Sequence, residues 1–160
     1  MRKRRQEFTP VPASSVPAES ATGYPQPFAA RVRGRAKRRL AAAFGLANIG
    51  VNHTTLAPGA QSALLHRHSA SEEFIYVLSG TPLLRTDAGD FRLSPGMCAG
   101  FPPGGVAHHL VNDTNAPVEY LEIGDNPADD AASYPKDDLR AERGDDGRWR
   151  FLHRNGRPCR

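Results

Sequence analysis

Long apolar runs and a cysteine framework are both missing from this 160-residue chain. No apolar run approaches the roughly 18 residues of a membrane-spanning helix, so the sequence predicts no membrane association. Two cysteines cannot form the disulfide framework of a small secreted protein. We expect Cys98, in an apolar run, to be a small buried side chain, and Cys159 to be exposed. The basic N-terminus lacks the apolar core of a signal peptide, which predicts a cytoplasmic protein.

Positive charge is concentrated in one short segment. The net charge is +4, yet residues 31–39 alone contain six Lys and Arg and no acidic residue. Such a segment can contact the phosphates of nucleic acid, or it can be a solvated face of a basic arm, or a patch that attracts small anionic molecules. No aromatic residue lies between the basic ones, and no helix-turn-helix or zinc-finger pattern is visible. Nucleic acid is therefore not the expected partner.

The order of apolar and turn residues predicts an all-β protein. Glycine and proline are both abundant, with 15 and 14 residues, which suits many short strands joined by tight turns. Residues 31–44 fit either a short helix or an edge strand. The remaining runs of strand character alternate with turn residues at regular spacing, which is typical of a sandwich or barrel. These runs are 46–56, 62–68, 73–78, 81–86, 91–93, 97–101, 106–112 and 118–123.

The chain divides by composition into three parts. Residues 1–27 hold five prolines among Ser, Ala and Thr, which predicts a disordered arm. Residues 28–126 contain the predicted barrel strands, with all sequence motifs inside 46–124. Residues 127–160 form a polar, irregular C-terminal extension, in which 149–154 could belong to a small hairpin.

Four side chains have the chemistry and spacing of a metal site. His66 and His68 lie two residues apart, so they share one face of an extended strand. Glu73 begins the next predicted strand after a Ser-Ala-Ser break and can face the same interior. His108 lies on a later strand. Imidazole and carboxylate together bind divalent metals of the first transition row.

Neighbouring residues are weaker ligand candidates. Glu72 and Glu73 point to opposite faces of their strand, and Glu72 lies nearer the turn, so Glu73 is favoured. His109 points away from His108 and is expected to pack or to lie at the surface. Three residues are weaker candidates for a catalytic acid or base: Tyr76, Tyr120 and Glu122. Asn112 is expected to satisfy a turn, and His53 is a lone histidine on a strand with no predicted role. Pro103, Gly104 and Gly105 are expected to shape the loop before His108.

Two spaced motifs resemble the signatures of the cupin superfamily. The first is Gly59, six residues, His66-x-His68, four residues, Glu73, six residues and Gly80, with one residue more than usual after the first glycine. The second is Pro103-x-Gly105, two residues, His108, three residues and Asn112, with its leading glycine, Gly96, displaced by one. Both departures lie in loops, and neither touches a candidate ligand.

The resemblance implies a small jelly-roll barrel with one divalent metal ion inside. His66, His68, Glu73 and His108 would hold the ion, and Fe, Mn, Zn and Ni all suit this ligand set. Four protein ligands leave coordination positions for a small anionic organic molecule. The sequence leaves open an oxygenase, an isomerase or lyase, and a non-catalytic small-molecule sensor. We also expect a homodimer, because related barrels often cover their sheet edges by pairing, and 31–44 and 149–154 are available for that.

Overall fold

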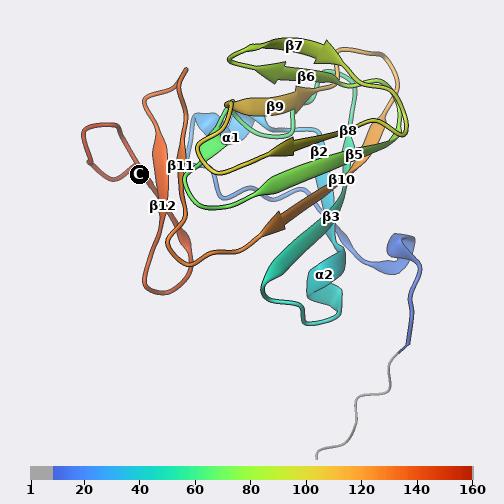
Figure 1. Ribbon diagram of the computed structural model, residues 1–160, viewed down its shortest axis with the longest axis horizontal. Coiled ribbons are helices and arrows are strands. Elements are labelled where there is room, and N and C mark those ends of the chain that lie inside the picture. Colours follow the sequence, from blue (N-terminus) through green and yellow to red (C-terminus); the bar gives the residue numbers. More distant parts are fainter. Residues whose placement is uncertain (1–8, 160) are drawn as a thin grey trace, which may run out of the picture.

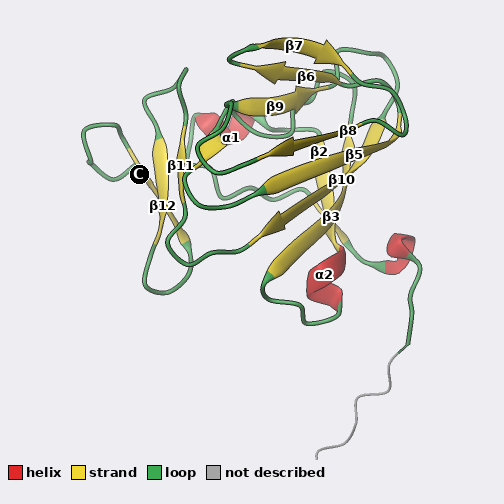
Figure 2. Ribbon diagram, viewed as in Figure 1, coloured by secondary structure: helices red, strands yellow, loops and turns green. Residues whose placement is uncertain are grey.

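Antiparallel strands are the main regular elements of the structure, a computed structural model that describes residues 9–159 (Figures 1 and 2). The expected all-β barrel fold is confirmed. Of the arm predicted at 1–27, residues 1–8 lie outside the described part. The two sheets that form the barrel pack face to face, and a third sheet lies beside the barrel at the C-terminal end of the chain (Figure 1).

The larger barrel sheet has six strands. In spatial order they are β1 (Ala18–Glu19), β2 (Arg35–Arg39), β3 (Ile49–Leu56), β10 (Val118–Asp125), β5 (Glu73–Ser79) and β8 (Cys98–Phe101). β10 lies in the middle and pairs with β3 along eight residues. Because side chains alternate between the faces of a strand, one set of alternate residues from each strand points into the barrel.

The smaller barrel sheet closes the interior from the other side. Its strands, in spatial order, are β7 (Gly89–Arg92), β6 (Leu83–Thr86) and β9 (His108–Val111). Apolar side chains of both sheets fill one end of the space between them. The fully or nearly fully buried members of this core are Leu56, Ala60, Ile75, Val77, Leu84, Leu93, Phe101, Leu110, Val118 and Tyr120.

The C-terminal extension is more regular than its composition predicts. β11 (Ala131–Ser133), β12 (Arg140–Arg143) and β13 (Trp149–Leu152) form an antiparallel sheet that continues onto β4 (Arg67–His68). Its apolar side chains form a second core around Leu64, Tyr134 and Leu139. Cys159 packs against this core and is half buried rather than exposed. The strand at 149–152 pairs with β12 before it, and the turn expected at Asn155-Gly156 is closed only by an isolated bridge between Leu152 and Pro158.

The N-terminal segment also joins the barrel within its described part. Residues 13–15 form a single 3-10 turn, and β1 pairs with β2. The Val16 carbonyl accepts a hydrogen bond from Arg38, and the Val16 side chain is buried. Backbone pairing and these contacts fix residues that their Pro-rich composition predicted to be disordered.

The basic segment is a strand inside the larger sheet rather than a solvated arm. β2 is paired on both sides, with β1 and β3, and two short helices flank it, α1 (Phe28–Arg31) and α2 (Leu40–Ala43). Its cations have partners inside the protein. These include Arg35 with the Ser62 carbonyl, Lys37 with Glu122, and Arg39 with Glu19. Charges satisfied in this way are not a free phosphate-binding surface.

Two local predictions need correction. Residues 62–68 were predicted to be a strand, but only β4 is regular, and the chain before it is held by single bridges from Gln61 and His66 to β9. Cys98 is exposed, because on β8 the inward positions are Ala99 and Phe101. Within 9–159, no helix is both long and apolar enough to cross a bilayer.

Gly80 should be the glycine least tolerant of substitution. Its φ is +77°, and a Cβ atom there would lie 2.7 Å from a Val118 methyl carbon and 2.9 Å from the Pro117 carbonyl oxygen. Gly59 has nearly the same φ, +79°, but no atom within 4 Å of such a Cβ. We expect Gly59→Ala to lower the free energy of unfolding by about 1–2 kcal/mol through backbone strain alone.

Gly80→Ala should cost about 1–3 kcal/mol more than this control, because the added atom also overpacks a rigid site. Urea denaturation of both variants measures the difference. Equal losses in the two variants would show that β10 moves freely to accommodate the new atom.

Candidate metal centre

A single β-bridge between the segments that contain His66 and His108 brings the histidines together. His66 and His108 exchange backbone hydrogen bonds, with N···O distances of 3.3 and 2.8 Å. His68 follows on β4, and both His66 and His108 are buried. The irregular chain before His66 is tied to β9 by Ser62, whose hydroxyl oxygen accepts a hydrogen bond from the Leu110 amide at 2.9 Å. These hydrogen bonds hold the two backbone segments in place, so that the imidazole rings point toward one place in the interior.

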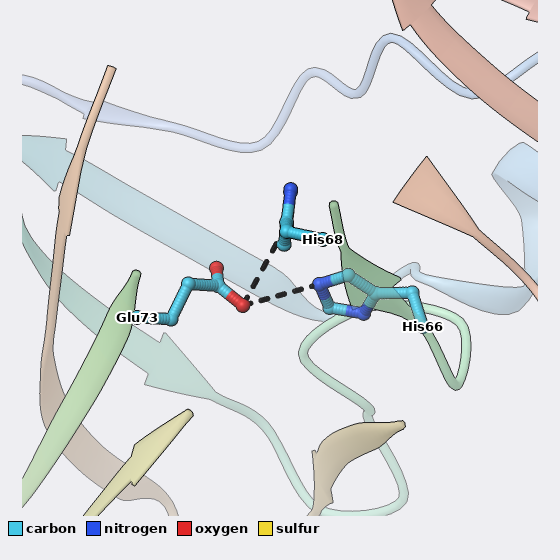
Figure 3. Close-up of side chains that lie close together, drawn as sticks. All are labelled: His66, His68 and Glu73. Carbon is cyan, nitrogen blue, oxygen red and sulfur yellow. Dashed lines mark ion pairs between the residues drawn. The ribbon is translucent and has the colours of Figure 1, made fainter. Parts of the chain in front are cut away.

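Glu73 lies at the point where the three imidazoles converge. Its Oε2 atom is 2.8 Å from His108 Nε2, 3.4 Å from His66 Nε2 and 3.6 Å from His68 Nε2. Figure 3 shows His66 and His68 directed at this carboxylate from the other side of the cavity. The ligand atoms of His66, His68 and Glu73 all lie within 4.8 Å of one another. The structure therefore brings together all four residues that the sequence singled out.

The other ring nitrogen of each histidine faces a hydrogen-bond acceptor. The Nδ1 atom of His66 lies 2.8 Å from the Leu64 carbonyl oxygen, and that of His68 lies 2.6 Å from Asp130 Oδ2. The Nδ1 atom of His108 lies 3.2 Å from the Val106 carbonyl oxygen. Acceptors at these positions assign the proton of each neutral ring to Nδ1. When a ring carries only this proton, its Nε2 lone pair faces the Glu73 carboxylate, and the two can bind together only through a cation between them, such as a metal ion.

The loop before His108 holds that ring in place. The Gly104 amide donates a hydrogen bond to the His68 carbonyl at 2.8 Å, so the loop is anchored to the other histidine pair. Gly104 has a φ of +67°, which favours glycine at this position. The ring of His108 stacks on Phe101 with centroids 3.4 Å apart. The predicted role of this loop in delivering His108 agrees with these contacts.

Burial and the interactions between Glu73 and the histidines have opposite effects on the pKa values of Glu73 and His66. Burial favours a neutral Glu73, but its hydrogen bonds with His108 and His66 hold its pKa well below the ordinary value. Burial favours a neutral His66, but the hydrogen bond and charge of Glu73 raise its pKa. Glu73 thus favours the protonated form of His66, and a metal ion must displace any proton from the Nε2 atom of His66 to bind there.

Asp130 is a functional residue that the sequence analysis missed. Its side chain is 2% exposed; Oδ2 accepts from His68 Nδ1, and Oδ1 accepts from the Ala70 and Ser71 amides at 3.0 and 3.1 Å. The two amides fix the carboxylate, and the carboxylate fixes the ring. Sixty-two residues separate Asp130 from His68. No local pattern could have indicated this contact.

The competing ligand candidates lie elsewhere. Glu72 is exposed, whereas Glu73 shares the inward face of β5 with the buried Ile75 and Val77. His109 points away from the cluster, and its Nδ1 lies 2.8 Å from the Ala63 carbonyl oxygen. Burial lowers the pKa of His109, which favours a neutral packing residue.

The weaker candidates separate into interior and exterior residues. Tyr76 is on the outer face of β5 and cannot reach the cluster. Tyr120 is in the apolar core, where burial raises its pKa well above the ordinary value. His53 faces outward, 3.4 Å from Glu119. Asn112 is fully buried and bonds to the Leu56 and Ala116 carbonyls, as expected for a residue that closes a turn.

Two of the cavities beside the cluster are lined by His68, Glu73 and Glu122 together. The first has a volume of about 440 Å³ and is lined by His68, Glu73 and Glu122 together with Arg39 and Arg143. The second has a volume of about 250 Å³ and reaches the same cluster from the side of the N-terminal segment and the C-terminal sheet. Its other lining residues include Tyr24, Lys37, Tyr134 and Trp149. A small organic molecule could therefore lie beside the candidate metal position.

The donor set fits a divalent metal of the first transition row. Three neutral imidazoles and one carboxylate leave a bound divalent ion with one net positive charge, and such ions accept further ligands. The supported Nδ1 atoms and the ionised Glu73 satisfy the requirements of such a site. The cavities provide access to the remaining coordination positions.

Comparison with known proteins identifies the family. The Cupin domain model matches residues 52–124. A sugar phosphate isomerase from a cupin superfamily, from Silicibacter pomeroyi, is 34% identical, with 94% of this chain and 96% of that chain covered and a TM-score of 0.88. The chain belongs to the cupin superfamily.

Two further solved structures are similar. A putative sugar phosphate isomerase from Acidithiobacillus ferrooxidans is 32% identical over 74% of this chain and 76% of that chain, with a TM-score of 0.70. The polyketide cyclase RemF from Streptomyces resistomycificus is 22% identical over 74% of this chain and 79% of that chain, with a TM-score of 0.62, and shares the fold. No curated protein matches the sequence significantly.

Asp130→Asn should weaken metal binding while keeping the shape of the side chain. The amide group can still accept from the two backbone amides, but its NH2 group then faces the Nδ1 proton of His68. We expect the dissociation constant for Zn²⁺ to rise about 10–100-fold, as for other residues that support a metal ligand. Competition with a chromogenic chelator measures the change.

Asp129→Asn is the matched control, because Asp129 is the exposed neighbour of Asp130 in the chain. It should bind Zn²⁺ as the unmodified protein does. Equal affinities in the two variants would mean that Asp130 does not orient His68.

Proposed function

We propose that this protein is a metal-dependent isomerase of a small phosphorylated sugar. The convergence of His66, His68, Glu73 and His108 on one point beside two cavities carries the proposal. We assign these four side chains as the ligands of one divalent metal ion, with Fe, Mn, Zn and Ni as candidates. When bound, the ion supplies a positive charge that polarises a carbonyl or hydroxyl oxygen.

A guanidinium and an indole ring in the first cavity suit a phosphorylated sugar. The Arg143 guanidinium lies 4.5 Å from the centre of the Trp149 ring, and both residues line that cavity. No carboxylate of residues 9–159 forms an ion pair with Arg143, whose bonds go to the Asn126 side chain and the Gly147 carbonyl. A guanidinium free of carboxylates can bind phosphate, and an indole face can pack against a sugar ring.

The two relatives above 30% identity support the isomerase class over the oxygenase and lyase classes. Both are described as sugar phosphate isomerases, one of them putative. The alternative is a non-catalytic sensor with the same barrel, in which the sugar phosphate binds at the metal without turnover. The two proposals share the binding site and differ only in the fate of the bound molecule.

The isomerase proposal predicts turnover that depends on Glu73 and not on Glu72. Protein loaded separately with Fe²⁺, Mn²⁺, Zn²⁺ or Ni²⁺ should convert an aldose phosphate of five or six carbons into its ketose, as followed by NMR. Glu73→Gln should lower metal affinity by more than about 100-fold, beyond the range for residues that only support a ligand. Turnover should fall with it.

Glu72→Gln is the control, since it removes an equal charge at the exposed neighbouring position. It should retain both metal and turnover. Metal loss in Glu72→Gln alone would contradict the ligand assignment. Binding of the sugar phosphates by the loaded protein without conversion would favour the sensor.

We further propose a homodimer, formed through a face of the larger sheet rather than through its edges. Of the two segments expected to cover edges, 31–44 contributes β2, which is paired on both sides, and β13 is the edge strand of the C-terminal sheet rather than of the larger barrel sheet. On the outer face of β5, however, Phe74, Tyr76 and Leu78 are each about 40% exposed. Three neighbouring apolar side chains on one flat face can pack against the same face of a second copy.

Tyr76→Glu should therefore convert the dimer into a monomer, because it places a charge at the centre of the proposed apolar face. Light scattering at micromolar concentration measures the mass. Phe91→Glu, at the exposed β7 position of the other sheet, should leave the dimer intact. A monomeric unmodified protein would refute the dimer.

A further inference from the structure

One ion pair inside the barrel takes no part in holding the candidate metal. Lys37 on β2 and Glu122 on β10 lie on either side of β3, and Lys37 Nζ is 2.6 Å from Glu122 Oε1. Each side chain is 21% exposed. A second hydrogen bond, from Asn52 Nδ2 at 3.3 Å, also goes to Oε1. Both charges thus face the barrel interior and are held by neighbours on adjacent strands.

The position of this pair is chemically specific. Glu122 lines both cavities, and each of those cavities also contains His68 and Glu73. Lys37 lines the smaller cavity, which also contains His66. A buried ion pair gives little net stability, since desolvation of two charges offsets their attraction. An apolar pair of similar size would fill the interior at less cost, so the pair indicates a chemical role.

The two oxygens of Glu122 have different environments. Among the described residues 9–159, every hydrogen bond to this carboxylate goes to Oε1, and none goes to Oε2. Burial alone would raise the pKa of Glu122, but the ammonium group of Lys37 lowers it below the ordinary value. Glu122 is therefore ionised at neutral pH, with one oxygen anchored and the other free to accept a proton.

We propose that Glu122 and Lys37 are the base and the acid that move protons on the sugar phosphate. The inference rests on the proposed isomerase function and assigns its proton-transfer residues. Glu122 Oε2 takes the proton from the carbon next to the carbonyl carbon. The electron pair of that C–H bond forms a carbon–carbon double bond, and the carbonyl oxygen takes a proton from the Lys37 ammonium. The product of this half-reaction is an enediol.

The second half-reaction restores both residues. The hydroxyl on the neighbouring carbon gives its proton to the Lys37 amine, and its O–H electron pair becomes the new carbonyl bond. The electrons of the carbon–carbon double bond take the proton back from Glu122 at the former carbonyl carbon. The carbonyl group has moved by one carbon, no oxidant or reductant is consumed, and the ion pair is re-formed.

The pairing of the two residues suits a partly enclosed cavity. Before proton transfer the pair is an ammonium and a carboxylate, and after it the pair is an amine and a carboxylic acid. The net charge of the pair is zero in both states, so no uncompensated charge is created in a medium of low dielectric constant. A lone carboxylate base would instead change the net charge of the cavity at each step.

The test follows exchange of the carbon-bound proton with solvent. The metal-loaded protein is incubated in D2O with D-ribose 5-phosphate and with D-glucose 6-phosphate, and deuterium at carbon 2 is measured by proton NMR. Glu122→Gln should slow exchange by at least about 100-fold, the usual size of a general-base effect. Lys37→Met should also slow exchange strongly. Metal content, and calorimetric affinity for the sugar phosphates, should stay within about threefold of the unmodified protein.

Two matched controls separate this role from a general effect of charge. Glu119→Gln removes a carboxylate from the outer face of β10, and Lys136→Met removes an exposed ammonium. Both should exchange deuterium at the unmodified rate. If Glu122→Gln does not fold, the test uses Lys37→Met and Glu122→Asp instead. Glu122→Asp shortens the side chain of the base by one carbon. Both variants should exchange deuterium more slowly than the unmodified protein.

Three outcomes would overturn the inference, in distinguishable ways. Exchange at the unmodified rate in the folded Glu122 and Lys37 variants would refute the pair alone and leave the isomerase in place. Loss of metal or of sugar phosphate binding in these variants would assign the pair to the structure of the site. Binding without exchange by the unmodified protein would refute the isomerase itself, and the pair's proton transfer with it.

Discussion

The Glu73 carboxylate is the interaction on which the centre of this protein depends. One of its oxygens lies within 3.6 Å of the Nε2 atoms of three histidines, which come from two separate chain segments. This carboxylate is hydrogen-bonded to His108 at 2.8 Å and favours the charged form of His66, so it draws the rings together before any metal is present. The same charge then neutralises half of the charge of a divalent ion. The interior is thus prepared for a cation by one side chain.

Strand alternation connects this centre to the stability of the barrel. On β5, Glu73, Ile75 and Val77 share the inward face, so one strand contributes both a ligand and two core residues. On β10, Glu122 and Tyr120 are related in the same way. The barrel therefore has a polar end and an apolar end built from the same strands. Tight packing at the apolar end fixes the register that places the polar side chains.

Sequence alone could predict what depends on short spacing. The spacing of His66 and His68, the turn after them and the alternation of β5 together gave the face of Glu73 and the exposure of Glu72. The barrel class followed from regular strand and turn spacing. These features are local, and the physical rules for strands and turns act over a few residues.

What could not be predicted depends on contacts between distant segments. Asp130 lies 62 residues from His68, and Lys37 lies 85 residues from Glu122. A run of arginines looks the same in sequence whether it is a solvated arm or an inner strand, because its partners are elsewhere in the chain. Cys98 was assigned to the core because its neighbours are apolar, but the edge strand β8 turns it outward.

The hydrogen bond between Asp130 and His68 determines the order in which parts of the site can form during synthesis. All four candidate ligands have left the ribosome once residue 108 has emerged, but the carboxylate that orients His68 follows 22 residues later. β11, which pairs with β4 at His68, comes directly after it. A nascent chain therefore carries a complete set of donor atoms with an unsupported ring. The geometry that orients His68 is therefore complete only after residues 130–133 have emerged and β11 has paired with β4.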